Sequence, residues 1–262
     1  MTSLELLSNQ VEPQAGKPPL LFLHGMWHGA WVWEPYFLPY FGRLGYRAYA
    51  MSLSHHAGSP KRKALNLLRI RDYVSELREV VESLDESPVL VGHSMGGFIV
   101  QKYLEQYEAP AAVLMASVPP YGVWGGTLRV LKKFPFAFLK ANLTLNLEHV
   151  INALPRYRYI LSSGNIPEEE DRRNMQRAQS ESYLAYMDML GFNLVKPSKV
   201  RTPLLIIGGE ADRAISPAEV RKTAAKYGQK PLLFESLGHN LMLEPEYAKV
   251  ADAIHEWLGE HC

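Results

Sequence analysis

The sequence predicts an α/β fold with a mostly parallel central sheet, helices on both faces of that sheet, and a helical insertion. Three observations lead to this prediction. Short apolar runs alternate with longer amphipathic segments, the runs tend to end at a small residue, and one stretch from Pro119 to Pro197 breaks the alternation. Runs that are apolar on both faces are typical of parallel strands that helices cover from above and below.

The expected strands follow one another along the chain. They comprise residues 20–23, 46–51, 89–91, 111–115, 204–207 and 232–234. Apolar residues also recur at helical spacing, from Ile70 to Leu84 and from Tyr247 to Leu258. Pro245 precedes the second of these segments, and proline favours the start of a helix. We interpret both apolar stripes as helix faces that pack against the sheet.

The insertion is expected to form a helical cap over the sheet. It covers residues 119–197 and leaves an α/β core made of residues 1–118 and 198–262. Within the cap, the sequence predicts one helix over residues 143–154 and another after Pro167. Three glutamates follow that proline directly, and negative charge in the first turn of a helix is stabilised by the helix dipole.

The composition is that of an ordinary soluble protein and excludes several classes. Of the 262 residues, 47% are hydrophobic and 21% are charged, and the formal net charge is +1. Such a charge offers no field that would attract nucleic acid. The single cysteine, Cys262, excludes an intramolecular disulfide and a cysteine-based metal site. Because the first residues lack a signal-peptide pattern and no apolar run could span a bilayer, we expect a cytoplasmic protein without stable membrane insertion.

One short motif carries most of the chemical information. Gly92-His93-Ser94-Met95-Gly96 directly follows an expected strand and precedes a helical run. In so sharp a turn the serine adopts strained backbone angles, and glycine two residues before and after it avoids the clash of a Cβ. The turn exposes the hydroxyl above the first turn of the helix, where free N–H groups stabilise negative charge. The motif therefore predicts that Ser94 is a nucleophile.

A serine hydroxyl is a weak nucleophile, so it needs a base, and a third group should orient that base. His239 and Asp212 each follow an expected strand, and the chain order serine, acid, histidine is one of the known arrangements. Glu210 competes with Asp212 for the role of the acid, and we favour Asp212 because it lies further out on its loop. His93 is adjacent to the serine but is expected to point elsewhere.

The remaining histidines do not predict a metal centre. His55 and His56 lie in a loop that has no carboxylate at ligand spacing. A mechanism based on an activated serine also needs neither metal nor cofactor. We therefore expect no metal site and no cofactor.

Acyl transfer from an activated serine passes through an oxyanion, which preorganised N–H groups must stabilise. The residue after the nucleophile, Met95, offers one backbone N–H for this purpose. The second is expected from the loop after the strand at residues 20–23, where Met26 is the candidate donor. The two methionine side chains also suit the wall of an apolar pocket.

Together, these motifs resemble the α/β-hydrolase superfamily over most of the length of the chain. The resemblance is carried by four segments: His24-Gly25-Met26, Gly92-His93-Ser94-Met95-Gly96-Gly97, Gly209-Glu210-Ala211-Asp212 and Gly238-His239. It implies the α/β-hydrolase fold, with the cap lying over the carboxyl ends of the strands.

A local resemblance is narrower. Residues 24–31, HGMWHGAW, are similar to the opening of the plant methylesterase and hydroxynitrile lyase group. Lyases of that group place a lysine beside the catalytic histidine, whereas Asn240 stands here, so the resemblance implies hydrolysis. The chain also departs from a pattern that many members share, with Ser52 in place of an aspartate and Ala57 in place of a glycine.

The resemblance and the three candidate residues imply an esterase or lipase-like serine hydrolase. Its partner would be a small ester with an apolar acyl or alkyl group. The expected substrate-binding residues are Trp27, Leu128, Phe134, Phe136 and Phe138. The alternative for those in the cap is that they only pack the cap onto the core. The same stretch could also touch a lipid surface, although its lysines and its proline make a weak interfacial helix.

Other functions remain open at this point. A cofactor-independent lyase or a carbon–carbon bond hydrolase would use the same three residues on another substrate. A small-molecule receptor could keep the fold without turnover. Dehalogenase and epoxide-hydrolase chemistry is excluded, because it needs a carboxylate nucleophile where Ser94 stands. The sequence is also compatible with a homo-oligomer.

Overall fold

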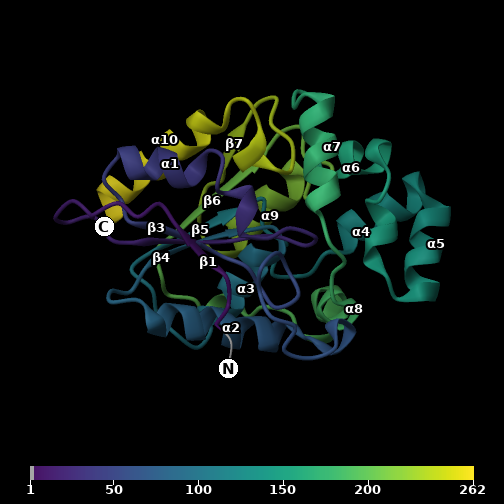
Figure 1. Cartoon of the computed structure of the whole chain (residues 1–262), viewed down its shortest axis with the longest axis horizontal. Coiled ribbons are helices and arrows are strands. Elements are labelled where there is room, and N and C mark those ends of the chain that lie inside the picture. The colour runs from purple at the N-terminus through teal and green to yellow at the C-terminus, as the bar shows by residue number, and fades with distance from the viewer. Residues whose placement is uncertain (1–2) are drawn as a thin grey trace.

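A computed structural model describes residues 3–262, and a seven-stranded sheet forms the centre of this part of the chain (Figure 1). The strand order is β1-β3-β2-β4-β5-β6-β7, and every pairing is parallel except that of β1 with β3. The strands are β1 (Leu6–Ser8), β2 (Leu20–Leu23), β3 (Ala48–Met51), β4 (Val89–His93), β5 (Ala112–Met115), β6 (Leu204–Gly209) and β7 (Leu232–Phe234). The six expected strands are thus confirmed, and β1 is added at the antiparallel edge.

Helices cover both faces of the sheet, as the fold class requires. One face carries α1 (Phe37–Arg43) and α10 (Tyr247–His261). The other carries α2 (Ile70–Ser83), α3 (Met95–Tyr103) and α9 (Pro217–Lys226). Successive side chains of a strand point to opposite faces, so the apolar runs supply two cores at once. In β2, for example, Leu20 and Phe22 belong to the core beneath α1 and α10, and Leu21 and Leu23 to the other core.

The chain between β5 and β6 forms a helical layer at one end of the sheet (Figure 1). Its elements are α4 (Trp124–Lys133), α5 (Pro135–Thr144), η3 (Leu147–Val150), α6 (Leu154–Leu161), α7 (Glu168–Arg177), α8 (Tyr183–Met187) and η4 (Asp188–Phe192). It has a small apolar cluster of its own, centred on residues such as Ala141, Tyr157 and Ile160. The remaining short turns are η1 (Ala30–Val32), η2 (Leu65–Leu67), η5 (Pro197–Lys199) and η6 (Leu241–Leu243).

The prediction of one helix over residues 143–154 is wrong. Helix α5 ends at Thr144, and Leu145 adopts a left-handed conformation with φ of 51°. Asn146 then caps a new short turn, because its side chain accepts a hydrogen bond from the N–H of Glu148. The local cap chemistry therefore divides an apolar run that looks continuous in sequence. The helix expected after Pro167 is present as α7.

Buried ionic contacts attach this layer to the core. Glu181, between α7 and α8, lies 3.3 Å from the imidazole of His56, and both side chains are fully buried. Tyr73 donates a hydrogen bond of 2.7 Å to the same carboxylate. Burial opposes a charge on His56, but Glu181 outweighs it and raises the pKa of His56. A second pair joins Arg69 to the buried Asp188. The carboxylate partner of His56 is thus distant in sequence, outside the loop in which none stands at ligand spacing.

Over residues 3–262, no helix has both the length and the apolar character needed to cross a bilayer.

Candidate active site

The turn between β4 and α3 has the strained geometry that the motif predicts. Ser94 has φ of 54° and ψ of −118°, a backbone conformation that residues other than glycine rarely adopt. A Cβ at Gly92 would lie 2.6 Å from the carbonyl oxygen of Gly96, and one at Gly96 would lie 2.5 Å from the carbonyl oxygen of His24. Both glycines are therefore required by close backbone contacts, and the turn lifts Ser94 away from the sheet.

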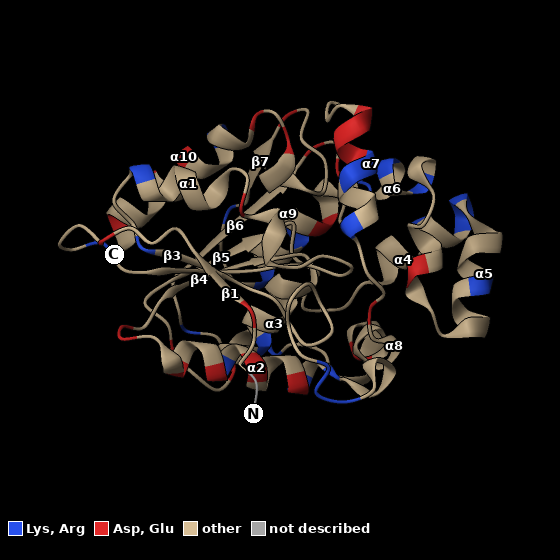
Figure 2. Ribbon diagram, in the orientation of Figure 1, with Lys and Arg blue, Asp and Glu red and all other residues tan. Residues whose placement is uncertain are grey.

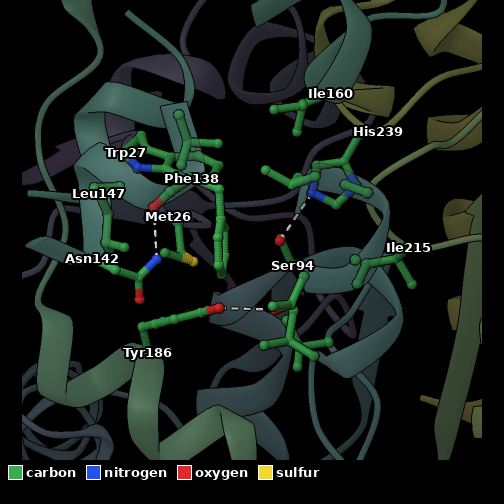
Figure 3. Close-up of a pocket in the computed structure, with 18 residues that line it drawn as sticks. Met26, Trp27, Ser94, Phe138, Asn142, Leu147, Ile160, Tyr186, Ile215 and His239 are labelled. Carbon is green, nitrogen blue, oxygen red and sulfur yellow. Dashed lines mark hydrogen bonds between the residues drawn. The ribbon is translucent and has the colours of Figure 1, made fainter. Parts of the chain in front are cut away.

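Three side chains meet at this turn from three separate loops. The Nε2 atom of His239 lies 2.9 Å from the Oγ atom of Ser94, and its Nδ1 atom lies 2.8 Å from Oδ2 of Asp212. His239 follows β7 and Asp212 follows β6, so the carboxyl ends of neighbouring parallel strands bring them together. All three residues are buried, and Figure 3 shows the imidazole directed at the serine oxygen.

The carboxylate of Asp212 is held on both of its oxygens. Oδ1 accepts hydrogen bonds from the N–H groups of Ala214 and Ile215, at 2.7 and 2.9 Å. This leaves Oδ2 for the imidazole of His239. The competing acid, Glu210, is half-exposed and pairs with Arg221 at 2.7 Å. The structure therefore places Asp212, and not Glu210, beside His239.

The loop of His239 is fixed by His93, for which the sequence predicted no such role. His93 donates a hydrogen bond of 2.9 Å from Nε2 to the carbonyl oxygen of His239, so it does not simply point elsewhere. Burial, followed by the nearby His239, lowers the pKa of His93 well below its usual value. A neutral ring that donates from Nε2 fits this contact. The signal for this role was the position of His93 next to the serine.

A buried carboxylate adds a second anchor for the same loop. Glu244 accepts hydrogen bonds from the N–H groups of Gly238 and Ser163, at 3.0 and 2.9 Å. Burial raises the pKa of Glu244. Because Ser163 follows α6 in the helical layer, the loop of His239 is tied to both parts of the chain.

The two candidate oxyanion donors lie close to the serine. A Cβ at Gly25 would be only 2.7 Å from the Cβ of Ser94, so the loop that contains Met26 lies against the nucleophile. Met95 is the first residue of α3. Within residues 3–262, the N–H groups of Met26 and Met95 form no hydrogen bond. Two free donors beside the serine are what a developing oxyanion requires.

A carboxylate from another segment contacts Ser52, the residue that stands in place of the family's aspartate. The Oγ atom of Ser52 accepts a hydrogen bond of 2.8 Å from the N–H of Ala30 and donates one of 2.5 Å to Glu5. Glu5 comes from the segment just before β1. An acid from elsewhere in the chain thus lies beside the position where many relatives carry an aspartate.

A largely apolar pocket opens above Ser94 and His239 (Figure 3). It encloses about 690 Å³, part of which is open to solvent. Its wall comprises Met26, Trp27, Val118, Val123, Gly126, Thr127, Val130, Phe138, Ala141, Asn142, Leu147, Val150, Ile160, Tyr186, Ala214 and Ile215. Most of these residues come from the helical layer between β5 and β6. Such a pocket suits an apolar group attached to the reacting carbonyl.

The expected substrate-binding residues divide into two groups. Trp27 and Phe138 line the pocket. Leu128, Phe134 and Phe136 do not, so the prediction is wrong for these three as pocket walls. Phe136 is 85% exposed on the outer side of α5, and Phe134 packs against Tyr159. Composition identified an apolar stretch but could not tell which face of each helix turns inward.

Few polar side chains reach this pocket, and the hydroxyl and amide groups among them have hydrogen-bond partners within the protein. The hydroxyls of Thr127 and Tyr186 are 3.0 Å apart. Asn142 donates to the carbonyl oxygen of Phe138 at 2.7 Å and accepts from Tyr183 at 2.8 Å. Each of these groups is already engaged in a hydrogen bond, and the indole N–H of Trp27 is buried without a partner in the described residues, so the wall offers few free groups to a polar substrate.

The chain belongs to the alpha/beta hydrolase family, whose family model matches residues 20–253. Solved structures support the same fold. A monoacylglycerol lipase from Paleococcus ferrophilus aligns over 100% of both chains, with a TM-score of 0.71 and 18% identity. A bromoperoxidase from Bacillus anthracis aligns over 97% of this chain and 94% of its own, with a TM-score of 0.73 and 18% identity. At this level of identity, the likeness concerns the fold alone.

Curated relatives include plant and bacterial proteins. Salicylic acid-binding protein 2 from Nicotiana tabacum is 37% identical over 107 residues, which are 39% of this chain and 40% of that protein. The match therefore spans only about two fifths of the length of this plant relative. A monoacylglycerol lipase from Mycolicibacterium smegmatis is 23% identical over 84% of this chain and 81% of its own.

Proposed function

We propose that this protein is a serine hydrolase that cleaves carboxylic esters with an apolar acyl or alkyl group. One observation carries the proposal: the continuous hydrogen-bonded path from Ser94 through His239 to Asp212 at the base of an apolar pocket. In this proposal, residues 1–118 and 198–262 carry the chemistry, and residues 119–197 form the cap that shapes the pocket. No metal or cofactor takes part.

The first half of the reaction forms an acyl-enzyme. Ser94 attacks the carbonyl carbon of the ester while His239 takes the hydroxyl proton, and Asp212 stabilises the imidazolium that results. The oxyanion accepts hydrogen bonds from the N–H groups of Met26 and Met95. The tetrahedral intermediate then collapses, the C–O bond to the alcohol breaks, and His239 gives its proton to the departing alcohol.

The second half repeats these steps with water. His239 removes a proton from the water that attacks the acyl carbon, and the oxyanion is held as before. Collapse breaks the bond to Ser94, the serine oxygen regains a proton from His239, and a carboxylic acid leaves. The names of the relatives, which include a monoacylglycerol lipase and a methylesterase, are consistent with ester substrates.

The test is the variant Ser94→Ala assayed with short aryl esters. We expect kcat to fall by about 10⁴-fold or more without a change in thermal stability, because the nucleophile alone is removed. Ser75→Ala is the matched control, since Ser75 is exposed on α2, does not line the pocket, and donates a hydrogen bond to the carbonyl of Arg71. Full activity of Ser94→Ala would overturn the proposal.

A fluorophosphonate probe separates this proposal from a receptor. An activated serine should be labelled stoichiometrically at Ser94, whereas a receptor without an activated nucleophile should not react. Labelling without ester turnover would instead favour a lyase or a carbon–carbon bond hydrolase that uses the same residues.

A further inference from the structure

The two faces of helix α5 have opposite surroundings although both are apolar. Phe138, Ala141 and Asn142 point inward and line the pocket. Leu139 and Leu143, on the other side, are 54% and 76% exposed. A surface helix normally turns a mainly polar face to water, so two leucines this exposed on the outer side of α5 are unusual.

Helix α4 repeats this arrangement, and the two helices lie side by side at the end of the molecule farthest from α10 (Figure 1). Thr127 and Val130 of α4 face the pocket. The exposed apolar residues of these two adjacent helices, together with Leu145 just after α5, are here called the outer cap face. The outer cap face comprises Trp124, Leu128, Leu131, Phe136, Leu139, Leu143 and Leu145, all of them exposed.

The side-chain charges on α4 and α5 themselves are of one sign, and Glu148 follows in η3, which packs against α5. Residues 124–147 contain no aspartate or glutamate and four basic residues, Arg129, Lys132, Lys133 and Lys140. Arg129 is neutralised by Glu219, whereas none of the three lysines forms an ion pair within residues 3–262. The acidic first turn of α7 lies at another edge of the helical layer, so the layer is polarised (Figure 2).

We infer that the outer cap face docks on a lipid surface that carries anionic head groups. Exposed leucine and phenylalanine side chains would enter the boundary between head groups and acyl chains, and the lysines would meet the phosphates. The sequence pattern argued against this because three lysines and one proline make a weak interfacial helix. The structure divides the stretch into two adjacent helices, each with exposed apolar side chains. Lys132 and Lys140 are exposed on them, and Lys133 lies over the ring of Tyr159.

Charge complementarity favours a lipid surface over a second copy of this chain. In a symmetric contact through the outer cap face, the lysines of the two copies would be brought into one interface, where like charges repel. An anionic surface is attracted by the same three charges. The small net charge of the whole chain does not prevent this, since only charges near the surface act within a Debye length.

Docking in this orientation would also serve the reaction, a point that rests on the proposed function. The helices whose outer sides would touch lipid form the wall of the substrate pocket with their inner sides. An apolar ester dissolved in the lipid could then pass into the pocket with little exposure to water. The substrate class would accordingly be lipid-soluble esters rather than small polar ones.

The test is sedimentation with vesicles in the absence of substrate. We expect the full chain to bind vesicles of phosphatidylglycerol and phosphatidylcholine, to bind pure phosphatidylcholine about tenfold or more weakly, and to be released by salt. Leu143→Glu should reduce binding to the anionic vesicles by about tenfold or more, because it places a charge in the apolar face. The matched control is Phe192→Glu, which adds the same charge at an equally exposed apolar residue, 71% against 76%, on η4 outside the outer cap face.

The possible outcomes separate the two proposals. Turnover of a water-soluble acetyl aryl ester should be the same in Leu143→Glu as in the unmodified protein, whether or not docking occurs. No vesicle binding at low salt, or equal binding by Leu143→Glu, would overturn the inference and leave the proposed function untouched. A dimer in solution that Leu143→Glu dissociates, without vesicle binding, would assign the face to self-association and also overturn it.

Discussion

The guanidinium of Arg129 donates a hydrogen bond of 2.7 Å to the carbonyl oxygen of Ala214. It also donates a hydrogen bond of 2.8 Å to the carbonyl oxygen of Arg213, so helix α4 holds the loop that follows Asp212. The N–H groups of Ala214 and Ile215 hold Oδ1 of Asp212. The helical layer between β5 and β6 is thus connected to Asp212 through two steps of hydrogen bonding.

Replacing Arg129 should therefore impair catalysis more than binding. We expect Arg129→Gln to lower kcat about 10-fold with a KM for short aryl esters within about twofold, because Asp212 orients His239 only when its own loop is fixed. Arg172→Gln is the matched control, since Arg172 pairs on the surface of α7 with Glu168. Steady-state kinetics that show equal effects of the two substitutions would refute this role.

The depth of the pocket should set the length of the acyl chain. Ala141 is fully buried on the inner side of α5 and lines the pocket. Ala141→Phe should fill part of it, so that kcat/KM for octanoyl esters falls about tenfold or more while that for acetyl esters stays within about threefold. Because the kcat/KM values for octanoyl and acetyl esters are measured on the same variant, the acetyl ester serves as the control for the octanoyl ester. A uniform loss for both esters would indicate general damage to the fold.

The sequence was sufficient for the features that local patterns encode. Each buried strand was visible as an apolar run, and the close contacts of Gly92 and Gly96 explain why the motif around Ser94 could predict a sharp turn. Parallel strands end at one edge of a sheet, so residues that follow β6 and β7 could be expected to meet. The position of Asp212 and His239 follows from that rule.

What the sequence could not provide depends on contacts between distant segments. The partner of His56 is Glu181, 125 positions later, and the partner of Ser52 is Glu5, from before the first strand. The pocket wall depends on which side of α4 and α5 faces the core, and an apolar stretch with hydrophobic residues all round does not specify this. Edge strand β1 is too short and too exposed to leave a periodic signal.

Breaking the buried pair of His56 and Glu181 should destabilise the fold. His56→Phe leaves a fully buried carboxylate with Tyr73 as its remaining side-chain donor, and we expect a loss of about 3–5 kcal/mol in the free energy of unfolding. Urea titration would measure it, with His149→Phe at a partly exposed histidine as the control. The double variant with Glu181→Leu should recover part of the loss. An unchanged midpoint in His56→Phe would contradict the proposed contribution of the pair.

Asp171 should make the stability of the protein depend on pH in an unusual direction. It lies on α7 with its side chain 1% exposed, 3.1 Å from Arg158, and burial raises its pKa to about 6 from 3.8. Between these two pH values the folded state holds the proton more tightly than the unfolded state. The free energy of unfolding contributed by Asp171 therefore decreases as the pH rises from about 4 to about 6, by up to about 3 kcal/mol.

The variant Asp171→Asn removes this titration and isolates its effect. The quantity to follow is the free energy of unfolding of the unmodified protein minus that of Asp171→Asn. This difference should decrease as the pH is raised from 4 to 6.5. The contributions of all other groups cancel in it. Glu168→Gln, at a largely exposed position of the same helix, should give a nearly constant difference. If the Asp171→Asn difference were also constant, or if it moved in favour of the unmodified protein, then the ion pair with Arg158 would outweigh burial, and the pKa of Asp171 could not be raised.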